Sequence, residues 1–165
     1  MVWFGLVWFG ATVNLIRQQQ AGPWLSNSIN YSIDGMYAAR YISQMTWDVE
    51  YTNEFGDWWA NLSESEQEAL DSSVRLLEAR GPGLGYPHSS GLNGSRHKHM
   101  RELRTQQGGK PLRTLYAFDP RRSAILLIGG DKTGDDRWYD IHIPIADQLY
   151  DHHIAQLQKE GLIDG

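Results

Sequence analysis

The sequence contains no cysteine, and this absence excludes several kinds of protein. A chain without thiols has no disulfide framework, no thiolate zinc site and no cysteine nucleophile. The sequence also lacks an excess of positive charge, because 15 Lys and Arg stand against 20 Asp and Glu, for a formal net charge of -5. Such a charge, taken alone, argues against a nucleic-acid partner. The lack of cysteine fits a reducing compartment, and we expect a cytoplasmic protein.

The motifs of several enzyme classes are missing as well. No arrangement of Ser, His and Asp and no carboxylate pair stands out. The stretch GLGYPHSSG, residues 83–91, has the glycines of a phosphate-binding loop, but it follows a predicted helix rather than a strand. His97 and His99 lie two residues apart without a third ligand nearby, which is a weak zinc signal. We therefore expect neither a bound metal nor a cofactor.

The positive charge that the chain does have is concentrated in one segment. Residues 96–122 hold eight Lys and Arg against two Asp and Glu, which gives a net charge of +6. Residues 45–95 hold two basic and nine acidic residues, and residues 123–165 hold three basic and eight acidic ones. A basic island in an acidic protein indicates a phosphate-bearing ligand, because local potential steers charged partners more than net charge does. The alternative is a solvated basic face.

The first 44 residues differ in character from the rest. They begin with MVWFGLVWFGATVNLI, which is apolar over 16 residues and slightly short for a membrane-spanning helix. The first positive residue is Arg17, so the basic start of a signal peptide is absent. We interpret residues 1–44 as an N-terminal extension of uncertain order, with a membrane anchor as the alternative. The folded domain is expected to occupy residues 45–165.

Residue spacing predicts a strand followed by two helices at the start of this domain. In TWDVEYT, residues 46–52, large apolar residues alternate with polar ones, which is the period of a half-buried strand. Asn53 is expected to cap a short helix with apolar residues on one face. Ser63 and Glu66 form a capping box for a second helix, and RGPG, residues 80–83, ends it.

Three further strands and a terminal helix are predicted after a long loop. The strands are expected at residues 100–106, 111–118 and 123–129, with Pro120 in a type I turn between the last two. AILLIGG in the last strand is continuously apolar, so this strand should lie centrally with both faces covered. Pro144 suits the first turn of the terminal helix. The order β-α-α-β-β-β-α indicates an α+β fold.

Two arginines are expected to face each other on the first two of these strands. If the hairpin turns at Gly108 and Gly109, Arg104 lies opposite Arg113. Like charges opposed across a ladder destabilise a hairpin by about 0.2 to 1 kcal/mol. Glu102 lies on the same face and can neutralise one arginine, so the other is left for an anion. Arginine is permanently charged and can bind a phosphate through two N–H groups.

Several segments, taken together, resemble a known family. A strand and a helical hairpin are followed by ELRT, LRTLYAF, an apolar strand and GGDKTGDDRWYDIHIPIADQLYDHHI. In this order they resemble the RelE-like toxins of bacterial type II toxin-antitoxin systems, in the phage Gp49 or HigB-like branch, over about residues 47–157. The resemblance implies a small microbial RNase fold, with a twisted, mainly antiparallel sheet, helices on one side of it and an open basic face.

The resemblance also implies an activity and partners. Typical members cut mRNA, commonly in the ribosomal decoding site, and thereby inhibit translation until a cognate antitoxin silences them. For this chain that implies a metal-independent endoribonuclease whose partners are mRNA, the ribosome and a helix-turn-helix antitoxin of the HigA kind, with no membrane partner. The alternative is a protein of the same fold that binds without cleaving, such as a gyrase-targeting protein of the ParE kind.

Carried over to this chain, the family pattern marks three basic residues as catalytic. Arg104 matches the residue that ends the ELR strand, Arg113 the arginine of the next strand, and Lys132 the lysine after the last strand. Many Gp49-like members have a lysine-rich tract where this chain has DKTGDDRWYD, residues 131–140, so weaker RNA binding is expected from this loop. Lys132 remains open as an acid, a base or an electrostatic group. Further RNA contacts are expected from Arg101, Lys110, His99, Arg137 and Tyr139.

Overall fold

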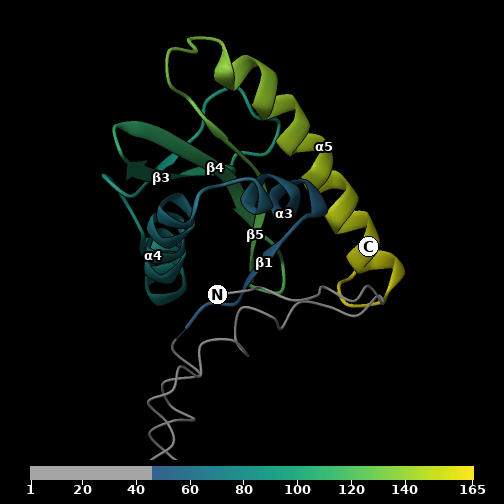
Figure 1. Ribbon diagram of the computed structural model, residues 1–165. Coiled ribbons are helices and arrows are strands. Elements are labelled where there is room, and N and C mark those ends of the chain that lie inside the picture. The colour runs from purple at the N-terminus through teal and green to yellow at the C-terminus, as the bar shows by residue number, and fades with distance from the viewer. Residues whose placement is uncertain (1–45) are drawn as a thin grey trace, which may run out of the picture.

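A five-stranded sheet organises the part of the chain that the computed structural model describes, residues 46–165 (Figure 1). The interpretation of residues 1–44 lies outside these described residues. The strand order is β1-β5-β4-β3-β2, with β1 parallel to β5 and the other neighbours antiparallel. The predicted α+β class is therefore confirmed. The elements are β1 (Val49–Tyr51), α3 (Asn53–Ala60), α4 (Glu64–Arg80), the 3-10 turn η2 (Gly81–Gly83), β2 (Ser89–Gly91), β3 (Arg101–Gln107), β4 (Lys110–Phe118), β5 (Ala124–Asp131) and α5 (Trp138–Lys159).

Helices cover both faces of this sheet. Beneath α3 and α4, Leu70 packs in one core with Leu103 of β3. Beneath α5, Ile143 packs in a second core with Leu115 of β4. Successive residues of a strand point to opposite faces, so the two cores lie on opposite sides of the sheet. The expectation that helices lie on one side only is wrong, because the apolar stripe of α5 requires burial as well.

The helix starts follow capping chemistry, with one correction. The prediction that Asn53 caps α3 is wrong, because Thr52 has the extended backbone of a cap and its side-chain oxygen accepts a hydrogen bond from the third helical residue. The capping box at α4 is confirmed: the Ser63 backbone N–H donates to Glu66 Oε2 over 2.8 Å, and the Glu66 N–H donates back to Ser63 Oγ. α4 ends at Arg80, and Gly81 is its C-cap with a φ of 53°, so the predicted stop at residues 80–83 is confirmed.

α5 begins earlier than the sequence indicated. Placing Pro144 in the first turn is wrong, because the helix begins at Trp138 and Pro144 lies inside it. Trp138 is 2% exposed and approaches Gly130 so closely that an added Cβ there would lie 2.7 Å from the indole nitrogen. Burial of this large ring offsets the hydrogen bond that proline cannot donate. Within residues 46–165, neither α5 nor any other helix is long and apolar enough to cross a membrane.

The predicted hairpin and central strand are confirmed, and one short strand is an addition. β3 and β4 turn at Gly108 and Gly109, both with positive φ, and Arg104 pairs with Arg113 in the ladder. β5 lies between β1 and β4, covered on both faces. β2 pairs antiparallel with β3 inside the segment predicted as a loop. Three residues are too few to show a strand period, so no sequence pattern indicated this strand.

Gly129→Ala should destabilise the fold. A Cβ at Gly129 would lie 2.0 Å from Cζ3 of Trp58, a ring carbon of an indole packed on the first core. Because the ring must move, we expect a loss of about 1 to 3 kcal/mol in the free energy of unfolding, measured by urea titration. Gly91→Ala is the control, since nothing lies within 4 Å of its added Cβ. Equal stability of the two variants would contradict the packing of Trp58 on β5.

Candidate functional site

Arg104 and Arg113 lie side by side on the face of the sheet that α5 also packs against. They are directly paired between β3 and β4. Arg113 lies two residues before Leu115, which belongs to the core beneath α5, so both arginines share that face. The side chain of Arg104 is 31% exposed, whereas that of Arg113 is 8% exposed. The pair therefore extends from the protein interior to solvent.

Glu102 is the anion between the two arginines. Its carboxylate lies 3.6 Å from Nε of Arg113 and 3.9 Å from Nε of Arg104, and its side chain is 8% exposed. The hydroxyl groups of Ser90 and Tyr139 each donate a hydrogen bond to it, from β2 and α5 respectively. One carboxylate thus faces two guanidinium groups, so the cluster keeps a net positive charge.

Arg113 has a buried N–H group that makes no hydrogen bond within the part of the chain that the structure describes. Its Nη1 donates to the carbonyl of Leu112 over 3.0 Å. Its Nε is buried and has no hydrogen-bond partner among residues 46–165, since the 3.6 Å to Glu102 is too long. A buried N–H without a partner costs about 1 to 3 kcal/mol, so an anionic oxygen within reach of this group would bind favourably.

Lys132 and Tyr139 complete the cluster from the other side. The backbone N–H of Lys132 donates to the carbonyl of Pro111 over 3.1 Å, which holds the residue beside β4. Its Nζ lies 5.3 Å from the centre of the Tyr139 ring. Burial, reinforced by the hydrogen bond to Glu102, raises the pKa of the Tyr139 hydroxyl. The phenol therefore stays protonated and links Lys132 to the arginine pair through Glu102. We call Glu102, Arg104, Arg113, Lys132 and Tyr139 the basic cluster.

Two of the predicted RNA contacts are engaged elsewhere. Arg101 points to the other face of the sheet, where its Nη2 donates to the carbonyl of Leu84 over 3.0 Å and its Nε lies 3.2 Å from Ser89 Oγ. Lys110 forms an ion pair of 2.8 Å with Glu66, and the hydrogen bond of that pair raises the pKa of Lys110. Neither side chain joins the basic cluster.

The other two predicted contacts differ in position. Arg137 precedes α5 and is exposed close to Tyr139 in sequence. The ring of His99 packs against Tyr150, with centroids 5.1 Å apart. Tyr150 lies 11 residues after Tyr139, or roughly 16 Å along the helix, so His99 is remote from the basic cluster. Burial, with the neighbouring His97, lowers the pKa of His99.

Two members of this neighbourhood were not predicted as site residues. Glu102 was expected to neutralise one arginine, but it contacts both and also accepts from Tyr139. The alternation of side chains along β3 places Glu102 and Arg104 on one face, so this role of Glu102 could have been predicted from the sequence. Ser90 belongs to the unpredicted β2, and no sequence pattern marked it.

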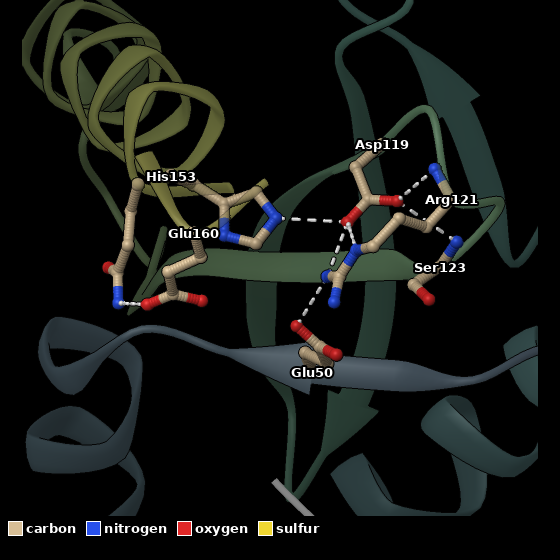
Figure 2. Close-up of polar contacts among 7 residues, drawn as sticks. Glu50, Asp119, Arg121, Ser123, His153 and Glu160 are labelled. Atoms are coloured by element: carbon tan, nitrogen blue, oxygen red, sulfur yellow. Dashed lines mark hydrogen bonds and ion pairs between the residues drawn. The ribbon is translucent and has the colours of Figure 1, made fainter. Parts of the chain in front are cut away.

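A second polar cluster joins β1, the turn after β4, and α5. Glu50, Asp119 and His153 offer three ligand atoms within 4.8 Å of one another, a geometry that could hold a metal ion. Figure 2 shows the guanidinium of Arg121 between the two carboxylates, with Nη2 2.6 Å from Asp119 and 2.7 Å from Glu50. His153 lies 3.0 Å from Asp119 on the other side. The chain's own cation therefore neutralises this cluster, which ties three elements together.

Asp119→Asn should destabilise the protein at neutral pH much more than at acidic pH. Burial opposes ionisation of Asp119, but hydrogen bonds from His153 and Arg121 outweigh it and lower the pKa from 3.8 to about 2. A lowered native pKa means that the ionised carboxylate contributes stability above pH 3.8 and that this contribution is lost as the pH falls through 2. The expected difference at neutral pH is roughly 2 kcal/mol.

Urea unfolding of the wild type and the variant at neutral pH and near pH 2 measures this contribution. The exposed Asp57 on α3 supplies the control Asp57→Asn, which should leave the stability unchanged at both values. A destabilisation by Asp119→Asn of equal size at both pH values would show that the carboxylate charge is not its cause.

The chain is similar to proteins of one family over most of its described length. A family model described as phage derived protein Gp49-like matches residues 57–151, which include every residue of the basic cluster. Putative toxin HigB3 of Mycobacterium tuberculosis is 44% identical over 105 residues, covering 63% of this chain and 90% of HigB3. Putative toxin HigB2 of the same organism is 42% identical over 103 residues, covering 61% of this chain and 51% of HigB2. The match thus spans about half the length of HigB2.

Two solved structures are more distant. The archaeal RelE-RelB complex from Pyrococcus horikoshii OT3 has 14% identity and a TM-score of 0.42, covering 55% of this chain and 99% of that one. A mutant of E. coli toxin RelE in the free state has 10% identity and a TM-score of 0.42, covering 68% of this chain and 99% of that one. Both TM-scores are low, so the assignment to a family rests on the sequence matches.

Proposed function

Because the chain belongs to the phage derived protein Gp49-like family, within the RelE-like and HigB branch predicted from its sequence, we propose that it is the toxin of a toxin-antitoxin module and an mRNA endoribonuclease. The observation that carries the proposal is the basic cluster: two arginines and a lysine from three different strands or strand ends surround one carboxylate and one phenol. Such a cluster suits a phosphate that gains negative charge during reaction.

The reaction is transesterification by the RNA's own 2'-hydroxyl. The 2'-oxygen loses its proton and forms a bond to phosphorus, and the bond from phosphorus to the 5'-oxygen breaks as that oxygen gains a proton. The products are a 2',3'-cyclic phosphate and a 5'-hydroxyl end, with no water or other reactant consumed. Two negative oxygens on the phosphorus approach their maximum charge at the transition state, so fixed cations accelerate the step.

The residues of the basic cluster divide this work. Arg113, buried and with an unpaired Nε, binds a non-bridging oxygen of the phosphate, and Arg104 binds from the solvent side. Lys132 supplies a third positive charge. Glu102 positions both arginines and Tyr139. Its negative charge also reduces the repulsion between the two arginines in the absence of substrate.

The partners follow from the same proposal. The mRNA is cut while the ribosome presents it, and translation is thereby inhibited. A cognate antitoxin, of the helix-turn-helix HigA kind, silences the toxin by covering the basic cluster or by presenting acidic residues to the segment 96–122, which carries a net charge of +6. The protein acts in the cytoplasm.

Cleavage of mRNA in a translating extract tests the function directly. The purified full chain is added to ribosomes that translate a defined mRNA, and the new RNA ends are mapped and tested for a 5'-hydroxyl. We expect discrete cuts with 5'-hydroxyl ends, lost when the nucleotide before the cut is 2'-deoxy. Intact mRNA together with inhibited DNA supercoiling would replace the nuclease with a gyrase-targeting protein of the ParE kind.

A further inference from the structure

Tyr86 is the most exposed large hydrophobic side chain within residues 46–165, at 80% exposure. Single exposed aromatic residues are common on protein surfaces and need no explanation by themselves. Tyr86 differs because of its neighbour: the guanidinium carbon of Arg104 lies 5.3 Å from the centre of its ring. An arginine of the basic cluster thus connects this ring directly to the proposed phosphate site.

The turn that carries Tyr86 is firmly anchored on both sides. Leu84 before it is completely buried, and its carbonyl accepts a hydrogen bond from Arg101 Nη2. Ser89 after it is 1% exposed, and its hydroxyl lies 2.7 Å from the hydroxyl of Tyr116. Buried anchors on either side present the exposed ring in a fixed position, so little conformational entropy is lost when a ligand packs on it.

The turn is also joined to the arginine itself. The backbone N–H of Arg104 donates to the carbonyl of His88 over 2.8 Å, and the N–H groups of His88 and Ser89 donate to the carbonyl of Gly85. This short chain of hydrogen bonds fixes the distance between the ring of Tyr86 and the strand that carries Arg104. Arg104 meets Glu102 only at 3.9 Å, so its five N–H donors retain capacity for a phosphate.

From this arrangement we propose that Tyr86 is a stacking platform for an unpaired nucleobase of single-stranded RNA, next to the phosphate that Arg104 and Arg113 bind. The proposal rests on the proposed function and adds a residue that contacts the RNA beside the phosphate site. A base can stack on a tyrosine ring only when it is not already stacked in a duplex, so the site selects single-stranded RNA. Stacking uses the face of the base, so Tyr86 adds affinity and register without strong sequence preference.

The chemistry around the ring favours RNA over a protein partner. A protein interface of this kind needs a contiguous apolar surface, but the other exposed large hydrophobic residues of the described chain lie on α5 or beyond it, at Ile141, Ile145 and Leu162. The contact that Tyr86 does make is with a cation. An aromatic ring beside a guanidinium can stack on the base and bind the phosphate of a single RNA strand.

Equilibrium binding to a non-cleavable RNA tests the platform. A fluorescent single-stranded oligonucleotide with 2'-O-methyl groups has no 2'-hydroxyl nucleophile, so the full wild-type chain can be titrated without cutting it. Tyr86→Ala should weaken binding by about tenfold, because the stacked ring is lost. Tyr86→Phe keeps the ring and should bind as the wild type does. Leu162→Ala, which removes another exposed apolar side chain, is the matched control.

A series of oligonucleotides with one abasic position identifies the base. At one position the missing base should weaken binding of the wild type by a similar factor and leave Tyr86→Ala unaffected, because the two changes remove the same contact. Wild-type affinity in Tyr86→Ala, or equal abasic penalties in both proteins at every position, overturns the proposal. If Tyr86→Ala loses affinity for the protein encoded by the neighbouring gene but binds RNA as the wild type does, the proposal is overturned in favour of a protein interface.

The outcomes separate this proposal from the proposed function. A wild-type chain that cuts mRNA while binding independently of Tyr86 leaves the nuclease standing and removes the platform. A chain that never cuts mRNA, yet binds the oligonucleotide through Tyr86, removes the nuclease and keeps the platform. A chain that does not bind the oligonucleotide removes the platform, whatever it does to mRNA.

Discussion

Arg113→Ala should lower the rate of RNA cleavage by a factor of about one hundred or more, the loss typical when a fixed group that stabilises transition-state charge is removed. The side chain is 8% exposed, so its charge acts with little screening by water. Its Nε is also a buried donor without a hydrogen-bond partner in the described chain. A single-turnover cleavage assay on the same mRNA measures the effect.

Two further variants separate the role of Arg113 from general loss of charge. Arg113→Lys keeps a cation but not the planar fork of N–H donors, so it should recover only part of the rate. Lys98→Ala removes an exposed basic residue outside the basic cluster and should leave the rate nearly unchanged. Thermal melting shows whether Arg113→Ala remains folded. A folded Arg113→Ala protein with wild-type cleavage would remove the nuclease chemistry from this face of the sheet.

The arginine pair was predictable because it depends on local rules. A hairpin that turns at two glycines fixes its register, so the pairing of Arg104 with Arg113 follows from their distance to Gly108 and Gly109. The same rules exclude Arg101 from the pair. It lies three residues from Arg104, an odd spacing that places the two side chains on opposite faces of one strand.

The contact between Lys132 and Tyr139 was not predictable in the same way. It requires that α5 begin at Trp138, and this start depends on the fit of the indole against Gly130, a contact between two elements. Local signals indicated Pro144 as the start instead. Tertiary packing outweighed the local preference of Pro144 for the first helical turn. The same packing determines the position of Tyr139 beside Lys132.

Lys132→Ala should reduce cleavage by a factor of about one hundred, whereas Lys132→Arg should retain most of the activity. The Nζ lies 5.3 Å from the centre of the Tyr139 ring, where a cation is attracted by the face of the ring. Arginine also stacks on aromatic rings and stays charged, so it preserves both this contact and the charge directed at the phosphate. We therefore expect Lys132 to act electrostatically.

The comparison of these two variants determines the mechanism at this position. A lysine that transfers a proton cannot be replaced by arginine, because a guanidinium does not release its proton in proteins. Lys132→Arg as inactive as Lys132→Ala would therefore show that Lys132 is an acid or a base. Tyr139→Phe supplies the matching control, since it keeps the ring beneath Lys132 but removes the hydroxyl that donates to Glu102. If Lys132 acts through its charge alone, Lys132→Arg should cleave at a rate similar to that of the wild type and with the same pH dependence. Tyr139→Phe should then lower the cleavage rate by the same factor whether Lys or Arg occupies position 132.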